Sequence, residues 1–315
     1  SRAIEKVGLY IPGGTAPLFS TVLMLGIPAS IAGCEKIVLC SPPSKDGTIN
    51  PAILFTAQLV GITEIYKVGG VQAIAALAQG TELIPKVDKI FGPGNQYVTA
   101  AKSFALTKGV AIDMPAGPSE VLVITDESSN PAFVAADLLS QAEHGPDSQV
   151  ILLSTSLTLL QGVQREITEQ ITGLPRIALA EQALNNSAFV QLDSLEECIE
   201  LSNLYAPEHL ILAFDSASTY CAQIKNAGSV FVGKYSCESA GDYASGTNHT
   251  LPTNGYARNY SGVSLDSFVK KITFQELSAA GIQTLGPAIE IMAEAEQLLA
   301  HKNAVSIRLN ALKNV

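Results

Sequence analysis

Several features that mark other classes of protein are missing from this sequence of 315 residues. No uninterrupted apolar run reaches the roughly 20 residues that a membrane-spanning helix needs. Residues 1–10 also lack the basic-then-apolar pattern of a signal peptide. Charged residues are few, at 15%, while the hydrophobic fraction of 47% excludes a disordered chain. We therefore expect a soluble, cytoplasmic protein without a membrane partner.

The sequence is also poor in positive charge. Its 19 lysines and arginines are outnumbered by 29 acidic residues, which gives a formal net charge of -10. A nucleic-acid-binding surface needs a basic patch, so this balance argues against nucleic acid as a partner. Small molecules and other proteins are left as possible partners.

Histidine and paired cysteine are scarce. The five cysteines include no C-x-x-C pair, so we interpret them as reduced core thiols rather than a disulfide set or a zinc ribbon. There are only four histidines. Any chemistry that requires an imidazole must therefore use His144, His209, His249 or His301.

Common catalytic and nucleotide-binding motifs are absent. Neither GxGxxG after a strand nor GxxxxGK[ST] occurs, so the sequence has no standard dinucleotide motif and no P-loop. GxSxG and HExxH are missing as well, which argues against the usual hydrolases.

The chain is longer than one hydrophobic core usually organises, and short β-rich runs alternate with helical stretches along most of it. This alternation predicts an α/β protein with two tandem parallel-sheet domains, followed by a small, mainly helical domain. The Pro- and Gly-rich loop 114–120 sets the boundary, so the expected domains are residues 1–118, 119–263 and 264–315. The expected strands are residues 7–11, 36–40, 64–68, 89–91 and 110–114, then 121–125, 150–154, 189–192, 210–214 and 230–233.

Other segments are less regular. A long helix is expected to end near residue 173, and another helix is expected near 216–227. Residues 241–262 are rich in Gly, Ser, Thr, Tyr and Asn without a helical period, so we predict a long loop of the kind that often carries function.

Two pairs of side chains are candidates for chemistry in the predicted second domain. Gln141 and His144 are three residues apart near the end of a helix, so both can reach one ligand or metal. Glu208 and His209 are adjacent at the start of a strand, where a carboxylate and an imidazole can divide acid-base work. A capped helix end and a surface ion pair with a turn histidine are the alternative interpretations.

Further candidates lie toward the C-terminus. Asp242 is a hard oxygen ligand suited to zinc, manganese or magnesium, although it can equally form an Asx turn; it shares its loop with His249. Glu296 and His301 are five residues apart, which puts them on different faces of a helix unless the helix ends between them.

Spacing alone leaves three hypotheses open. The chain can be a dehydrogenase, a zinc hydrolase in which Glu208 activates water, or a two-lobed solute-binding protein built from the paired α/β units.

The sequence resembles the histidinol dehydrogenase family. The resemblance covers nearly the whole chain, in the family's order, and rests on the strings LYIPGGTAPLFSTVLML, VGGVQAIAALAQGT, KIFGPGNQYVTAAK, IDMPAGPSEVLVI, DLLSQAEHGPDSQVILL, APEHL, GSVFVG, SAGDYASGTNHTLPT and AHKNAVSIRLNAL. It implies a zinc-containing homodimer that oxidises L-histidinol through histidinaldehyde to L-histidine with two NAD+, the last step of histidine biosynthesis.

The resemblance also implies roles for particular residues. His209 would be the general base that takes the alcohol proton, and Glu208 would activate the water that attacks the aldehyde. The implied zinc ligands are Gln141, His144, Asp242 and, from the neighbouring subunit, His301.

The remaining implied contacts involve substrate and cofactor. Ser119 and Glu296 match substrate-contacting positions, with Glu296 reaching in from the partner chain. The zinc ligands and His209 would touch the substrate as well. NAD contacts fall on Tyr10, Gln72 and Asn95, in incomplete Rossmann-like domains that use turns and helix N-termini in place of GxGxxG.

One feature of the family is not matched. The family has a long, mainly helical segment before the LYIPGG strand, and those helices contribute to packing and to the intertwined dimer. This sequence has no counterpart, and it starts at Ser1 rather than Met, which suggests a fragment or a processed product.

Overall fold

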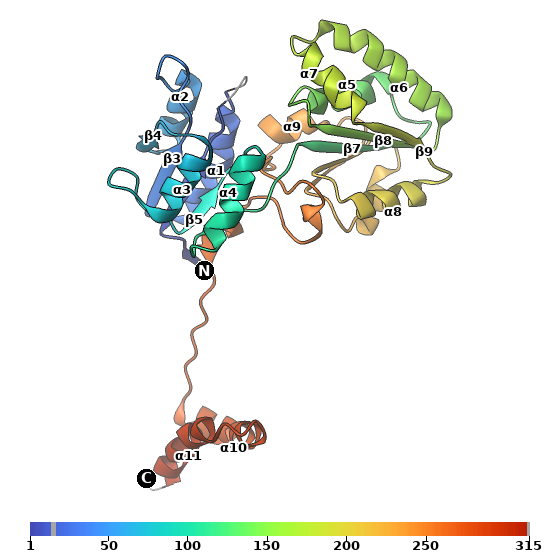
Figure 1. The fold of residues 1–315 in the computed structure, drawn as a ribbon. Coiled ribbons are helices and arrows are strands. Elements are labelled where there is room, and N and C mark those ends of the chain that lie inside the picture. Colours follow the sequence, from blue (N-terminus) through green and yellow to red (C-terminus); the bar gives the residue numbers. More distant parts are fainter. Residues whose placement is uncertain (14–16, 314–315) are drawn as a thin grey trace. The chain divides into compact units, whose positions relative to one another are not determined.

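The structure, a computed structural model, describes residues 1–13 and 17–313. It divides into two compact units, residues 1–270 and 271–315. The first contains two five-stranded parallel sheets with helices around them, and the second is helical (Figure 1). The predicted α/β class with a helical C-terminal region is confirmed.

The first sheet has the strand order β4-β3-β2-β5-β6, and each neighbouring pair is parallel. Its strands are apolar on both faces: in β3, Leu39 packs under α1 and α2, while Val38 and Cys40 pack under α3 and α4. A parallel sheet covered on both sides requires this composition. The elements are β2 (Lys6–Tyr10), α1 (Phe19–Ala32), β3 (Lys36–Cys40), α2 (Pro51–Leu59), β4 (Glu64–Tyr66), α3 (Gly70–Gln79), β5 (Lys89–Phe91), α4 (Gln96–Leu106) and β6 (Ala111–Ile112).

The second sheet has the order β11-β10-β7-β8-β9 and is also parallel throughout. In its central strand β7, Val121 and Val123 face helices α5 to α7, whereas Leu122 and Ile124 face α8 (Figure 1). The elements are β7 (Glu120–Thr125), α5 (Pro131–Ala142), β8 (Gln149–Ser154), α6 (Leu157–Gln170), η1 (Ile171–Gly173), α7 (Ile177–Asn185), β9 (Ala188–Gln191), α8 (Leu195–Tyr205), β10 (His209–Leu212), η2 (Ala217–Gln223) and β11 (Ser229–Val232).

The local structure differs from expectation at three places. Helix α6 ends at Gln170 and η1 continues to Gly173, where the helix was expected to end, but the sequence analysis missed α7, which follows after Pro175 interrupts the chain. The segment near 216–227 forms only the short 3-10 helix η2, because Ser, Thr and Tyr favour the α-helix weakly. The predicted loop 241–262 begins inside a short helix, α9 (Glu238–Tyr243), and contains η3 (Tyr256–Arg258).

The chain returns from the second sheet to the first at residues 263–270. Phe268 is fully buried there, and its ring stacks on Phe91 with 4.0 Å between centroids. The elements of this segment are η4 (Leu265–Phe268) and β12 (Val269–Lys270), which pairs antiparallel with β1 (Arg2–Ala3). Although the predicted domain boundary is 263/264, the compact first unit extends to residue 270.

The second unit consists of two helices that pack on each other, α10 (Ala279–Ala295) and α11 (Leu299–Lys313). Gly286 of α10 lies against Leu309 of α11, where a larger side chain would collide. Lys302 and Glu294 form an ion pair of 2.8 Å across the turn between the helices. In the part of the chain that the structure describes, no helix is long and apolar enough to cross a membrane.

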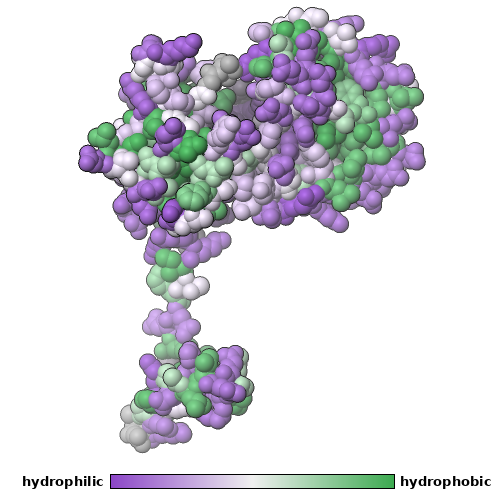
Figure 2. All heavy atoms as spheres, in the orientation of Figure 1, coloured by the Kyte–Doolittle hydropathy of each residue, from purple (hydrophilic) through white to green (hydrophobic). Residues whose placement is uncertain are grey.

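An apolar groove lies between α3 and α4. Its lining includes Val71, Ile74 and Phe104, and Figure 2 shows green, hydrophobic spheres in this part of the surface. Of its lining residues only Gln79, Tyr97 and Lys108 have polar side chains. The groove therefore lacks the grouped polar atoms that catalysis requires.

A buried ion pair fixes the turn that follows β5. Lys102 on α4 is 2% exposed and pairs with Asp113, and its Nζ also donates to the carbonyl oxygen of Gly92 at 2.8 Å. Asp113 in turn accepts from the backbone N–H of Gly92 at 2.7 Å. Gly92 has a φ of 130°, and a Cβ at this position would collide with the Tyr10 carbonyl, so only glycine fits.

We predict that Lys102→Met lowers the free energy of unfolding by about 3–5 kcal/mol, because it leaves the Asp113 carboxylate buried without its cation. The matched control is Lys36→Met. Lys36 pairs with Glu64 at 3.1 Å, but their side chains are 36% and 38% exposed, so the expected loss is below about 1 kcal/mol. Urea denaturation of both variants measures the difference, and equal losses would contradict the prediction.

Candidate active site

The predicted catalytic pair lies at the amino end of the second sheet. Ala206 follows α8 in the left-handed conformation, with φ 59°, and turns the chain so that Glu208 and His209 reach the start of β10. Glu120 begins the neighbouring strand β7. The catalytic candidates therefore lie beside Glu120, where two neighbouring parallel strands begin.

The backbone of Glu120 contacts both members of the pair. Its N–H donates to Oε2 of Glu208 at 2.9 Å, and its carbonyl oxygen lies 3.1 Å from Nδ1 of His209. Because a carbonyl oxygen can only accept, Nδ1 of His209 carries the proton and Nε2 keeps its lone pair. Nε2 is buried and has no hydrogen-bond partner among the described residues. It is therefore the atom of this ring that can take a proton.

Burial changes the acid-base properties of both side chains. His209 is 3% exposed, and loss of solvent lowers its pKa to about 4, so the ring is neutral near pH 7. Burial also raises the pKa of Glu208 well above its ordinary value, and the nearby carboxyls of Glu120 and Asp242 raise it further. His209 therefore has a free lone pair on Nε2 near pH 7, and the carboxylate of Glu208 binds a proton more readily than an exposed carboxylate does.

Four more polar side chains gather beside the pair. Gln141 and His144 come from the end of α5, with 3.1 Å between the amide and Nδ1 of His144. Glu238 and Asp242 come from α9, four residues apart and hence on one helix face. Oε1 of Glu238 lies 3.9 Å from Nδ1 of His209, which connects the cluster to the catalytic pair.

The donor set fits a cation of the zinc type. Potential ligand atoms of His144, Glu238 and Asp242 all lie within 4.8 Å of one another. Zinc binds imidazole nitrogen and carboxylate oxygen at about 2.0–2.2 Å, so one ion can reach several of these atoms at once. Burial raises the pKa of Asp242 to about 6 and that of Glu238 well above its ordinary value, as expected where carboxylates are held without a counter-charge.

His249 connects the cluster to helix α1, which packs on the first sheet. Its Nδ1 is 3.8 Å from Oδ1 of Asp242, and its Nε2 is 3.2 Å from Oγ1 of Thr21 on α1. The preceding Asn248 donates to the carbonyl oxygen of Met24 at 2.7 Å. This histidine thus joins Asp242 to α1.

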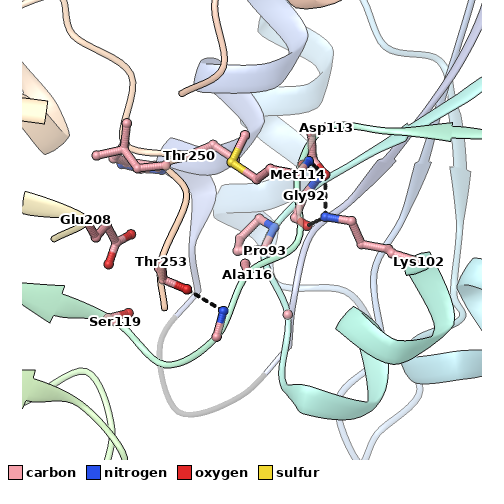
Figure 3. A pocket seen from close by; sticks show the side chains of 14 residues that line it. Gly92, Pro93, Lys102, Asp113, Met114, Ala116, Ser119, Glu208, Thr250 and Thr253 are labelled. Carbon is pink, nitrogen blue, oxygen red and sulfur yellow. Dashed lines mark hydrogen bonds and ion pairs between the residues drawn. The ribbon is translucent and has the colours of Figure 1, made fainter. Parts of the chain in front are cut away.

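A pocket opens next to Glu208, between the two sheets (Figure 3). The turn Gly92-Pro93-Gly94 lines one side, and Ser119, Glu208 and Thr253 line the other. Oγ1 of Thr253 accepts from the backbone N–H of Gly117, which ties the loop before β7 to the loop after α9. Ser119 is therefore placed at this pocket together with the predicted catalytic carboxylate.

The predicted cofactor contacts gather at the carboxyl end of the first sheet. Tyr10 ends β2, and its hydroxyl accepts from the N–H of Gly70 at 3.1 Å. Gln72 lies in the first turn of α3, and Asn95 caps the N-terminus of α4 through its side chain. In the strand order, the direction of the connections reverses between β2 and β5, and dinucleotides bind at such points in open α/β sheets.

Glu296 and His301 belong to the second unit. The helix does end between them: Glu296 caps the C-terminus of α10, and His301 lies near the start of α11. Both residues are exposed in this unit.

Sequence reasoning missed two residues of the site. Glu238 is 1% exposed within the cluster, and its four-residue spacing from Asp242 was the available signal. Glu120 directly follows Ser119, but nothing local marks it as a residue whose backbone holds Glu208 and His209.

Comparison with known proteins finds relatives that match nearly the whole chain. A histidinol dehydrogenase of Bacteroides fragilis (strain YCH46) is 65% identical over 311 residues, which covers 99% of this chain and 73% of that protein. The crystal structure of histidinol dehydrogenase from Elizabethkingia anophelis superposes with a TM-score of 0.97 at 68% identity, over 99% of this chain and 72% of that one.

More distant structures share the fold alone. An acetylating aldehyde dehydrogenase from Geobacillus thermoglucosidasius has a TM-score of 0.59 at 16% identity, over 88% of this chain and 76% of that one.

The family model for histidinol dehydrogenase matches residues 1–309. This chain therefore belongs to the histidinol dehydrogenase family, whose reaction is the NAD-dependent two-step oxidation of histidinol in histidine biosynthesis.

Proposed function

We propose that this chain oxidises L-histidinol through histidinaldehyde to L-histidine, with His209 and Glu208 as its catalytic residues. The observation that carries the assignment is that Nε2 of His209 has no hydrogen-bond partner among the described residues and is buried beside a cluster of potential metal ligands. Each oxidation removes a hydride from carbon and a proton from oxygen. NAD+ accepts the hydride in both steps, so side chains of the protein have to accept the protons.

His209 takes the proton of the substrate alcohol at Nε2. The Glu120 carbonyl holds the opposite ring nitrogen and so fixes the tautomer that can act as a base. In the second half of the reaction, water adds to the aldehyde carbon, and Glu208 takes a proton from that water. Burial makes Glu208 a stronger proton acceptor than an exposed carboxylate.

Gln141, His144 and Asp242 would hold the metal, and His301 of a neighbouring subunit would complete the set. A bound Zn²⁺ would position the amine and imidazole of histidinol and neutralise the surrounding carboxylates. Nitrogen and oxygen ligands also suit manganese. Ser119, at the pocket, and Glu296, from the partner chain, would contact the substrate.

The two sheets would divide the work. Residues 1–118 would bind NAD through Tyr10, Gln72 and Asn95, at helix N-termini that attract phosphate. Residues 119–263 would hold the metal and the substrate, and residues 264–315 would reach the other subunit of a homodimer. The negative net charge argues for small-molecule partners rather than nucleic acid, and we place this enzyme in the cytoplasm.

The direct test supplies histidinol, NAD+ and Zn²⁺ to the purified chain. We expect two equivalents of NADH for each histidinol consumed, with histidine as the product, because the family reaction has two oxidation steps. Absorbance of NADH and chromatography of the product measure both. Substrate consumption that does not require NAD+ would instead favour a zinc hydrolase, and binding without turnover would favour a solute-binding protein.

We predict that His209→Asn keeps the metal but loses most oxidation, whereas His144→Asn loses both. His209 contributes a base, while His144 contributes a ligand, so only the second change alters the metal site. Elemental analysis of the two purified variants, together with NADH formation, separates these roles. Equal zinc content in both would contradict the ligand assignment.

We also predict complementation between His209→Asn and His301→Asn chains. If each site combines His209 of one subunit with His301 of the other, a mixed dimer contains one intact site. Unfolding and refolding the variants together in equal amounts should then restore about a quarter of the parent activity, as random pairing in a twofold dimer requires. The absence of any rescue, with dimers present, would argue against a shared site.

A further inference from the structure

The side-chain amide of Gln141 lies between a hydrogen-bond acceptor and a ring nitrogen that can donate. Gln141 is fully buried, with the carboxylate of Glu238 on one side of its amide and Nδ1 of His144 on the other. Only one of the two amide orientations gives both of its ends a partner. In that orientation Nε2 donates to Oε1 of Glu238 at 2.7 Å and to Oε2 at 3.2 Å, and the amide oxygen faces Nδ1 of His144 at 3.1 Å.

The orientation matters because the two ends of the amide differ in chemistry and hardly at all in shape. The oxygen can bind a cation, whereas the NH₂ group has no lone pair to offer. A rotation by half a turn would therefore present the wrong end to a metal without any steric penalty. A carboxylate behind the nitrogen prevents this, since an amide oxygen in the same place would face two negatively charged oxygens.

Glu238 is well placed for this task. It is 1% exposed at the first residue of α9, so neither water nor a mobile side chain competes for its oxygens. Four residues later the same helix provides Asp242, which lies on the same face. One short helix thus holds a proposed metal ligand and the group that orients another.

We propose that Glu238 is a positioning residue that holds the oxygen of Gln141 toward the metal. The inference rests on the proposed function, in that Gln141 is taken to be a metal ligand. The competing role is that of a direct ligand, since a Glu238 oxygen also lies within 4.8 Å of ligand atoms of His144 and Asp242. The two roles differ in what they require: a positioning residue needs only a hydrogen-bond acceptor, whereas an anionic ligand needs the charge.

The experiment measures the Zn²⁺ affinity of the metal-depleted chain by competition with a chromophoric chelator, so it does not depend on catalysis. Glu238→Met keeps the side-chain volume and removes the acceptor, and we expect its affinity to fall about 10- to 100-fold. Glu238→Gln keeps an acceptor oxygen and should stay closer to the parent than to Glu238→Met. Asp137→Asn, on the turn of α5 before Gln141, is the charge control and should also stay near the parent.

A compensating variant tests orientation itself. Gln141→Glu offers an oxygen in either rotation, so the double variant Gln141→Glu with Glu238→Met should recover most of the lost affinity at an unchanged net charge. Circular dichroism and thermal unfolding establish that each variant is folded, and Glu238→Ala replaces Glu238→Met if that variant is not.

Several results would overturn the inference. Parent-like affinity in Glu238→Met, or equal losses in Glu238→Met and Glu238→Gln, would each remove the positioning role. The remaining control is Gln141→Ala. If it binds Zn²⁺ as tightly as the parent, the ligand set of the proposed function fails as well, whereas a loss in Gln141→Ala with none in Glu238→Met defeats the positioning role alone.

Discussion

The site depends on two hydrogen bonds made by the backbone of Glu120 at the start of β7. One holds a carboxylate oxygen of Glu208, and the other holds Nδ1 of His209. These bonds involve main-chain atoms of the central strand of the second sheet, so the tautomer of His209 is set by the same backbone that forms the sheet. The lone pair of Nε2 is therefore left free by a bond from Nδ1 to the main chain rather than to another side chain.

The carboxyl end of the first sheet faces the amino end of the second. The first contributes its carboxyl end, where the turn after β5 and the N-termini of α3 and α4 gather, as is usual for nucleotide sites in parallel sheets. The second contributes its amino end, where β7 and β10 begin. The pocket between the Gly92 turn and Glu208 joins these edges.

The carboxyl groups of the cluster are buried close to one another. Glu208 and Glu238 are almost fully buried, and Asp242 lies beside them with a raised pKa. Buried acidic groups remain charged only if a positive charge compensates them. Lys102 provides that charge for Asp113 at the neighbouring turn. The groups that face these three carboxyls are instead histidines, His209 for Glu208 and Glu238 and His249 for Asp242. The metal ion proposed above would supply a compensating charge.

The amino-acid sequence by itself determined the alternation of strands and helices, and the close spacing of Gln141 with His144 and of Glu208 with His209. These features follow from local periodicity and from neighbours along the chain. Only the tertiary structure decided that Glu238 enters the site, that His249 joins Asp242 to α1, and that Phe268 returns to the core of the first sheet. The physical reason is that such contacts join residues far apart in the sequence, and they form only once the two sheets have packed with their helices.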